Sequence, residues 1–101
     1  MGGSDDEKAP RLFKAAKKGN KTKVEELIKG GGHDVNEKHN GKTALFVAAK
    51  LGHSDVVRAL LAAPGIGVNL KNEKGKSPLK VARDNKHLDI AALLEAAGGT
   101  E

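Results

Sequence analysis

The chain has 101 residues, which is the size of one small domain with a single hydrophobic core. It contains no cysteine, so disulfide scaffolds, cysteine-based zinc modules and thiol nucleophiles are excluded. With two Phe, no Trp and no Tyr, any core must be aliphatic, and 18 basic against 13 acidic residues give a net charge of +5, which permits an acidic partner.

Residues 1–8 are expected to form a flexible leader that carries three consecutive acids, Asp5, Asp6 and Glu7. Residues 8–101 hold all 18 basic side chains and the other 10 acids, so the body has a net charge of +8. No window approaches the roughly 18 apolar residues of a membrane span, and no signal peptide is present. The sequence therefore predicts a soluble protein of the cytoplasm or nucleus that has no membrane partner.

A repeat of 33 or 34 residues organises the rest of the chain. Residues 45–53 match residues 12–20 at six of nine positions, and Leu, Val, Ala and His recur in residues 79–87. Such a period is typical of repeat proteins, in which each unit packs on its neighbours. The sequence predicts a single domain over residues 9–97, with repeats at about 9–41, 42–75 and 76–97, and a frayed C-terminus at 98–101.

Each repeat is predicted to contain two helices of about 8 to 10 residues, too short to be stable alone. Proline is tolerated in a first helical turn, and glycine favours a helix end. The first helices are expected to begin near Pro10, Ala44 and Pro78, and the first two to end at Gly19 and Gly52. The second helices are expected to open at the capping residues Thr22, Asp55 and Asp89.

The repeat resembles the ankyrin repeat, a 33-residue unit of a turn and two helices with a Thr-Pro-Leu-His-x-Ala signature. Residues 41–49 read Gly-Lys-Thr-Ala-Leu-Phe-Val-Ala-Ala, and residues 75–79 read Gly-Lys-Ser-Pro-Leu. Phe13, Phe46 and Lys80 replace the signature His, and the loops depart from the usual Gly-Ala-Asp-Val-Asn, so looser loops are expected. The resemblance implies an all-α helical solenoid of three helix-turn-helix repeats.

The two end repeats are expected to be polar caps, because the ends of a solenoid face water. With both ends polar, the array is expected to be complete at three repeats. Six polar residues take positions that the middle copy fills with apolar residues or glycine: Lys14, Lys23, Glu26, Arg83, Lys86 and Glu95.

No group of residues supports catalysis. His53, Ser54 and Asp55 are adjacent at a helix start, where they cannot form the chain of hydrogen bonds that activates a nucleophile. Because His87 recurs at the position equivalent to His53, a structural role at the helix junction is expected instead. The sequence predicts a protein that is not an enzyme.

Metal and cofactor sites are not expected either. His33 and His39 lack the ligand spacing of a zinc motif and are interpreted as surface loop residues. The glycines at residues 30–32 follow a helix and lack the Gly-Lys-Ser/Thr ending of a phosphate loop. We therefore expect no cofactor and no metal.

In the family that the repeat resembles, the loop tips and the exposed side of each first helix form a concave surface that usually meets a protein partner. Eight of the fourteen matching residues are lysines and two are acids, which favours an acidic partner, although lysines that serve only solubility are an alternative. The predicted partner-binding residues are Lys17, Lys18, Lys38, His39, Asn40, Lys42, Lys50, Leu51, Lys71, Glu73, Lys74, Lys76, Asp84 and Asn85.

Phe13 and Phe46 lie one repeat apart and are expected to stack as a short ladder. Two roles are open for them: packing in the core, or an exposed anchor for a partner.

The sequence predicts a non-catalytic protein–protein interaction module with a Lys-rich concave surface. An engineered ankyrin scaffold without a natural partner is one alternative. Nucleic-acid binding is another, disfavoured because the predicted surface has no Arg and no aromatic residue for base stacking. A monomer is expected, with self-association through the Phe or Lys side chains as the alternative.

Overall fold

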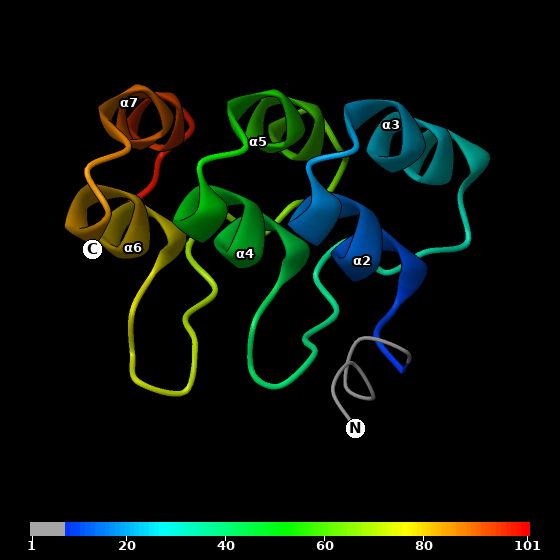
Figure 1. The fold of residues 1–101 in the computed structure, drawn as a ribbon, viewed down its shortest axis with the longest axis horizontal. Helices are drawn as coiled ribbons and strands as arrows, with labels where there is room; N and C mark the ends of the chain where they lie inside the picture. Colours follow the sequence, from blue (N-terminus) through cyan, green and yellow to red (C-terminus); the bar gives the residue numbers. More distant parts are fainter. Residues whose placement is uncertain (1–7) are drawn as a thin grey trace.

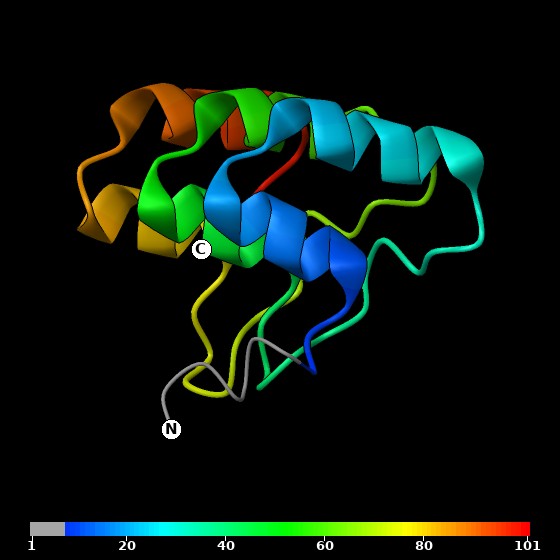
Figure 2. The same cartoon turned by 45° about the vertical axis from the view of Figure 1, so that its right-hand side comes forward.

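The computed structural model describes residues 8–101, and residues 1–7 of the predicted leader lie outside this range. Figures 1 and 2 show α2, α4 and α6 in one layer, α3, α5 and α7 in a second, and the loops between pairs extended to one side. This confirms the all-α solenoid of three helix pairs. The helices of the described chain are α2 (Arg11–Lys18), α3 (Lys21–Gly30), α4 (Ala44–Leu51), α5 (Ser54–Leu61), α6 (Pro78–Asp84) and α7 (Leu88–Ala96).

The first helix of each repeat begins at or next to the predicted position. Helices α4 and α6 begin at Ala44 and Pro78, whereas α2 begins one residue after Pro10. The preceding Thr43 and Ser77 are buried, and their hydroxyl oxygens accept hydrogen bonds from backbone N–H groups three residues later, at 3.0 and 3.1 Å. These caps satisfy helix donors that water could not reach.

The second helices begin earlier than predicted because the turn before each of them is short. Gly19 ends α2 with φ of 74°, and the N–H of Asn20 bonds back to the carbonyl of Ala15 at 3.0 Å. A glycine in this left-handed conformation lets the chain reverse within two residues. The predicted N-caps Thr22, Asp55 and Asp89 are therefore wrong by two residues. The N-cap residues in the structure are Asn20, His53 and His87.

The core is aliphatic and runs between the two layers. Helix α4 packs between α2 and α6, and four alanines of these helices, Ala16, Ala48, Ala49 and Ala82, have no exposed surface. Small side chains let helix axes approach closely, while Leu, Val and Ile fill the space between the layers. The repeats are thus held by one continuous core.

Both phenylalanines belong to this core. Phe13 is 6% exposed and Phe46 is 2% exposed, so neither side chain is an exposed anchor for a partner. The predicted Phe ladder does not form among the described residues, because the ring that meets Phe13 is His39, edge-on at 5.1 Å between ring centroids. The hairpin before α4 places the imidazole there.

Histidines connect neighbouring repeats. The Nε2 atom of His53 lies 3.0 Å from the carbonyl oxygen of Lys17, and that of His87 lies 3.2 Å from the carbonyl oxygen of Lys50. The His87 ring also lies against Gly52, where a Cβ would come within 2.8 Å of it. The His53 ring lies against Gly19 in the same way. Each ring therefore fills a space that glycine leaves open, and it contacts a carbonyl in the last turn of the first helix of the preceding repeat.

Asparagines connect successive repeats in the segments that follow the second helices α3, α5 and α7. The side-chain amide of Asn36 donates to the carbonyl of Gly65 at 2.9 Å, and its oxygen accepts from the N–H of Gly67 at 2.7 Å. Asn69, 33 residues later, makes the same two contacts with Gly98 and Thr100, at 3.3 and 2.9 Å. A two-point contact of this kind fixes both the position and the orientation of the next loop.

Residues 98–101, which the sequence predicts to be frayed, make contacts of their own. The N–H of Gly99 donates to the carbonyl of Leu94 at 2.7 Å. Arg83 pairs with both Glu95 and Glu101 across the last repeat. The charge of Arg83 is thus offset by two carboxylates at the surface.

Alanine in place of Gly52 is expected to destabilise the fold more than alanine in place of Gly75. Both glycines have φ near 80°, which costs about 1–2 kcal/mol for a residue with a Cβ, but only a Cβ at residue 52 would collide with His87. We expect the free energy of unfolding in urea to fall by at least about 1 kcal/mol more for Gly52→Ala. Equal losses would show that the His87 ring does not fill this space.

Removing the Asn36 amide is expected to weaken the contact between successive loops. Asn36→Ala leaves a partly buried N–H and a carbonyl without partners, so the free energy of unfolding should fall by about 1–3 kcal/mol in a urea titration. The neighbouring substitution Glu37→Ala, at an exposed residue, should change it by less than about 0.5 kcal/mol. Similar values for the two variants would contradict this role.

Candidate protein-binding surface

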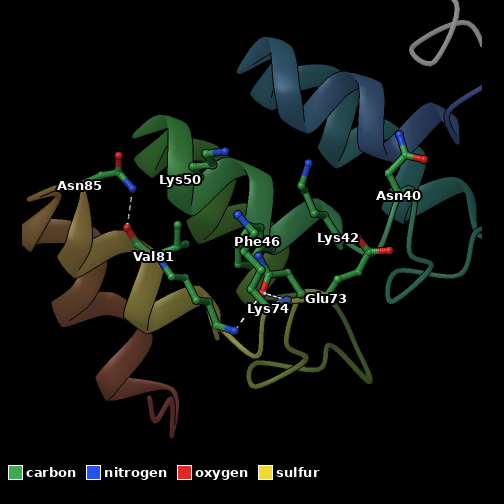
Figure 3. A pocket seen from close by; sticks show the side chains of 10 residues that line it. Asn40, Lys42, Phe46, Lys50, Glu73, Lys74, Val81 and Asn85 are labelled. Carbon is green, nitrogen blue, oxygen red and sulfur yellow. Dashed lines mark hydrogen bonds between the residues drawn. The ribbon is translucent and has the colours of Figure 1, made fainter.

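Two adjoining hollows lie where the hairpin loops meet the first-helix layer. The first, of about 410 Å³, is lined by Asn40, Lys42, Phe46, Lys50, Asn72, Glu73, Lys74, Lys76, Val81 and Asn85 (Figure 3). The second, of about 300 Å³, is lined by Phe13, Lys17, His39, Asn40, Lys42, Val47, Lys50 and Leu51. Asn40, Lys42 and Lys50 line both hollows, whose linings together come from three repeats. The two hollows together are called the trough.

The hairpin before α4 is shaped by its backbone. His39 and Lys42 exchange N–H···O bonds of 2.8 and 3.1 Å, and the two residues between them, Asn40 and Gly41, have φ of 54° and 78°. This is the geometry of a tight two-residue turn that fits the twist of a hairpin. It directs Lys42 and Asn40 toward the trough.

The hairpin before α6 is shaped by a side chain. The Asn72 Oδ1 accepts hydrogen bonds from the N–H groups of Lys74 and Lys76 at 3.0 and 2.9 Å, and the Asn72 N–H donates to the carbonyl of Lys76 at 2.9 Å. An asparagine that closes a turn on its own backbone stabilises the loop locally. Both lysines are thereby placed on the rim of the larger hollow.

The two hairpins are also tied to one another. The ammonium of Lys38 donates to the carbonyl of Lys71 at 2.9 Å, and the side chain of Glu73 lies so close to Gly41 that a Cβ there would come within 2.5 Å of it. These contacts join loops of successive repeats at their outer ends. The walls of the trough are therefore fixed relative to one another.

The rim of the trough is strongly basic. Five lysines line the two hollows, and Glu73 is the one carboxylate among the lining residues. Among the ion pairs of residues 8–101, none involves Lys42, Lys50 or Lys74. Several like charges held around one concavity raise its positive potential above that of a scattered set.

The floor of the trough is apolar but offers little surface. Phe46 and Val81 are 2% and 4% exposed, and Phe13 and Val47 are also buried. A partner would therefore meet mainly ammonium and amide groups, with the rings beneath them as a rigid support. The sequence names Phe13 and Phe46 as core residues or as anchors for a partner, and the structure places them in the core beneath the trough. The sequence assigns no role in binding to Val47 and Val81.

The structure brings most of the predicted residues together. Ten of the fourteen line the two hollows, and Lys18, Lys38, Lys71 and Asp84 do not. Lys18 lies at a separate hollow beside Arg11 and Asn20, and Lys38 and Lys71 meet at the loop ends. The ten residues are Lys17, His39, Asn40, Lys42, Lys50, Leu51, Glu73, Lys74, Lys76 and Asn85.

Asp84 modifies the surface through an ion pair. Its carboxylate lies 3.0 Å from the ammonium of Lys76 and 3.3 Å from that of Lys80. The hydrogen bond from Lys76 is the main cause that lowers the pKa of Asp84 below its ordinary value, and Lys80 adds to it. Asp84 therefore stays ionised at neutral pH and offsets part of the charge of Lys76.

His33 is exposed, His39 packs on Phe13, and no group of three or more His, Cys, Asp or Glu side chains is arranged to hold a metal ion in residues 8–101. Within the same residues, the helices are too short and too polar to cross a membrane.

The Asp84 ion pairs predict a pH-dependent contribution to stability. Because the pKa of Asp84 is lower in the folded chain than in the unfolded one, its carboxylate stabilises the fold at neutral pH and ceases to do so as the pH falls through the lowered pKa. Asp84→Asn should be less stable than the wild type at pH 7, and the difference should vanish at a pH well below about 4. Urea titrations across this pH range test this, with Glu37→Gln as the control; a difference that does not depend on pH would contradict it.

Comparisons with known proteins fit this geometry. A family model for three copies of the ankyrin repeat matches residues 12–100. The chain is 35% identical to alpha-latrocrustotoxin-Lt1a of Latrodectus tredecimguttatus over 79% of its length, and 37% identical to the ankyrin repeat and KH domain-containing protein mask-1 of Caenorhabditis elegans over 88%. It is 46% identical to cortactin-binding protein 2 of Ornithorhynchus anatinus over 52% of its length.

The chain spans only 3–6% of the length of these three relatives, so the similarity concerns their repeats and not their whole activities. The repeats of this family generally mediate protein–protein interactions and are typically not catalytic. The matched range, the three helix pairs and the loop geometry agree, and this chain is a member of the ankyrin-repeat family.

Proposed function

We propose that this chain is a non-catalytic protein-binding module whose Lys-rich trough takes an acidic segment of a partner protein. The observation that carries the proposal is the convergence of five lysines from three repeats around two adjoining hollows that contain a single carboxylate. Potentials of opposite sign speed the encounter between partners and select against basic or neutral competitors.

The available charge supports an acidic partner. Lys42 and Lys50 stand between the two hollows and have no ion pair within residues 8–101. Lys50 is exposed and Lys42 is half-buried, so their ammonium groups can reach a ligand while their stems rest on the helix layer. A bound carboxylate would neutralise charges that nothing in the described chain neutralises.

The rigidity of the trough supports the same proposal. Hydrogen bonds within each hairpin, and the contact between Lys38 and Lys71, hold the walls before any partner arrives. Binding to a surface that is already ordered costs less conformational entropy than binding to a flexible loop. A weak set of surface lysines can in this way give specific recognition.

Reversal of two trough charges is expected to weaken binding. We expect Lys42→Glu combined with Lys50→Glu to raise the Kd for a fluorescent hepta-glutamate peptide at least about tenfold at 50 mM salt, because two attractive contacts become repulsive. The wild-type affinity should fall as salt is raised, and the variant should show a weaker salt dependence.

A matched control separates position from net charge. Lys23→Glu with Lys29→Glu makes the same change of net charge on α3, in the other helix layer, and should leave the affinity nearly unchanged. Equal losses in the two double variants would contradict a role for the trough. If single-stranded oligo-dT bound more tightly than the peptide at the same salt, nucleic acid would replace the acidic protein as the proposed ligand.

A further inference from the structure

The two hollows are copies of one site, displaced by one repeat. Seven of the eight residues that line the smaller hollow have their repeat equivalent in the wall of the larger one, 33 or 34 residues later. Among these pairs are Phe13 with Phe46, Lys17 with Lys50, and Lys42 with Lys76. Each hollow thus has a buried ring beneath two lysines in equivalent places.

The eighth residue is Lys50. Its equivalent in the third repeat is Asp84, which does not line the larger hollow. Asp84 pairs with Lys76, but the second hairpin has one additional residue, Lys74, on the rim of the larger hollow. The extra lysine restores the basic character that the aspartate removes. Both hollows therefore remain suited to an anionic group.

The distance between the copies is set by helix packing. Helices α2, α4 and α6 lie side by side in direct contact, and packed helix axes are about 8–10 Å apart. Equivalent points of the two hollows therefore lie about 10 Å apart. A ligand that uses both hollows must present two anionic groups at this spacing on one side.

Only some peptide conformations meet this requirement. A polyproline II helix has three residues per turn and rises about 3.1 Å per residue, so residues i and i+3 point to the same side about 9.3 Å apart. Residues i and i+2 of a β-strand share a face at only about 6.6 Å. An α-helix matches at i and i+7, but a short free helix is marginally stable and must be ordered on binding.

We propose that the trough binds an acidic peptide in the polyproline II conformation, with acidic residues at positions i and i+3 seated in the two hollows. The backbone of such a peptide is hydrated and needs no strand partner, which suits a trough whose hairpin groups are already hydrogen-bonded to one another. The inference rests on the proposed function and adds to it the conformation and spacing of the ligand.

The test compares peptides of one composition that differ only in spacing. The probe is fluorescein-labelled Pro-Pro-Glu-Pro-Pro-Glu-Pro-Pro, and the controls carry the same two Glu residues at i,i+2 and at i,i+4 in an all-proline background. Linking two weak sites gives an advantage only when the spacing fits. We expect the i,i+3 peptide to bind at least about fivefold more tightly than either control in fluorescence anisotropy.

A variant that disables one hollow completes the test. Lys74→Gln with Lys76→Gln should remove the advantage of the i,i+3 peptide and leave three similar, weaker affinities, while circular dichroism verifies the fold. Lys21→Gln with Lys29→Gln, which lie on α3, should keep the spacing preference.

The outcomes separate the two proposals. If all three peptides bind equally, and Lys42→Glu with Lys50→Glu weakens them all, the conformation and spacing are wrong while the acidic ligand stands. If a helical peptide with Glu at i and i+7 binds more tightly than the i,i+3 peptide, the polyproline II conformation is wrong. If no acidic peptide binds at millimolar concentration, both proposals are overturned.

Discussion

The whole structure depends on contacts between repeats, because helices of seven to ten residues cannot hold themselves. Alanines without exposed surface let α2, α4 and α6 approach, and each interface is then fixed at two further points. One is a histidine that contacts a carbonyl in the last turn of the first helix of the preceding repeat, as His53 does with Lys17. The other is an asparagine amide on the next loop, as in Asn36 with Gly65 and Gly67.

The same contacts create the candidate binding surface. Because every repeat docks on the previous one in the same way, any hollow formed between a hairpin and a first helix is formed again one helix spacing further along. The trough is thus a direct product of the packing that stabilises the fold. Its basic character comes from lysines such as Lys42 and Lys76, whose charge is not required for the packing of the repeats.

Much of the fold could be predicted from the sequence, because a 33-residue period and the positions of Gly19, Gly52 and Pro78 report on local geometry. The N-caps of the second helices were predicted two residues too late, because the repeat period does not specify the length of the turn between the two helices of a repeat. The Phe13–His39 contact joins α2 to the hairpin before α4, so no local pattern reveals it. The Lys76–Asp84 ion pair joins a loop to the end of the following helix, so it depends on how the loop meets that helix. The cross-repeat asparagines could have been found, because their recurrence after 33 residues was visible.

The central claim is that recognition takes place in the trough on the first-helix side. The most direct measurement is an NMR titration of the ¹⁵N-labelled protein with an acidic peptide, following each backbone amide. We predict chemical-shift changes at Lys42 in the hairpin before α4, at Lys50 on α4, and at Lys74 and Lys76 in the hairpin before α6. Little change is predicted on α3, α5 and α7. Changes concentrated on the second-helix layer would contradict the account.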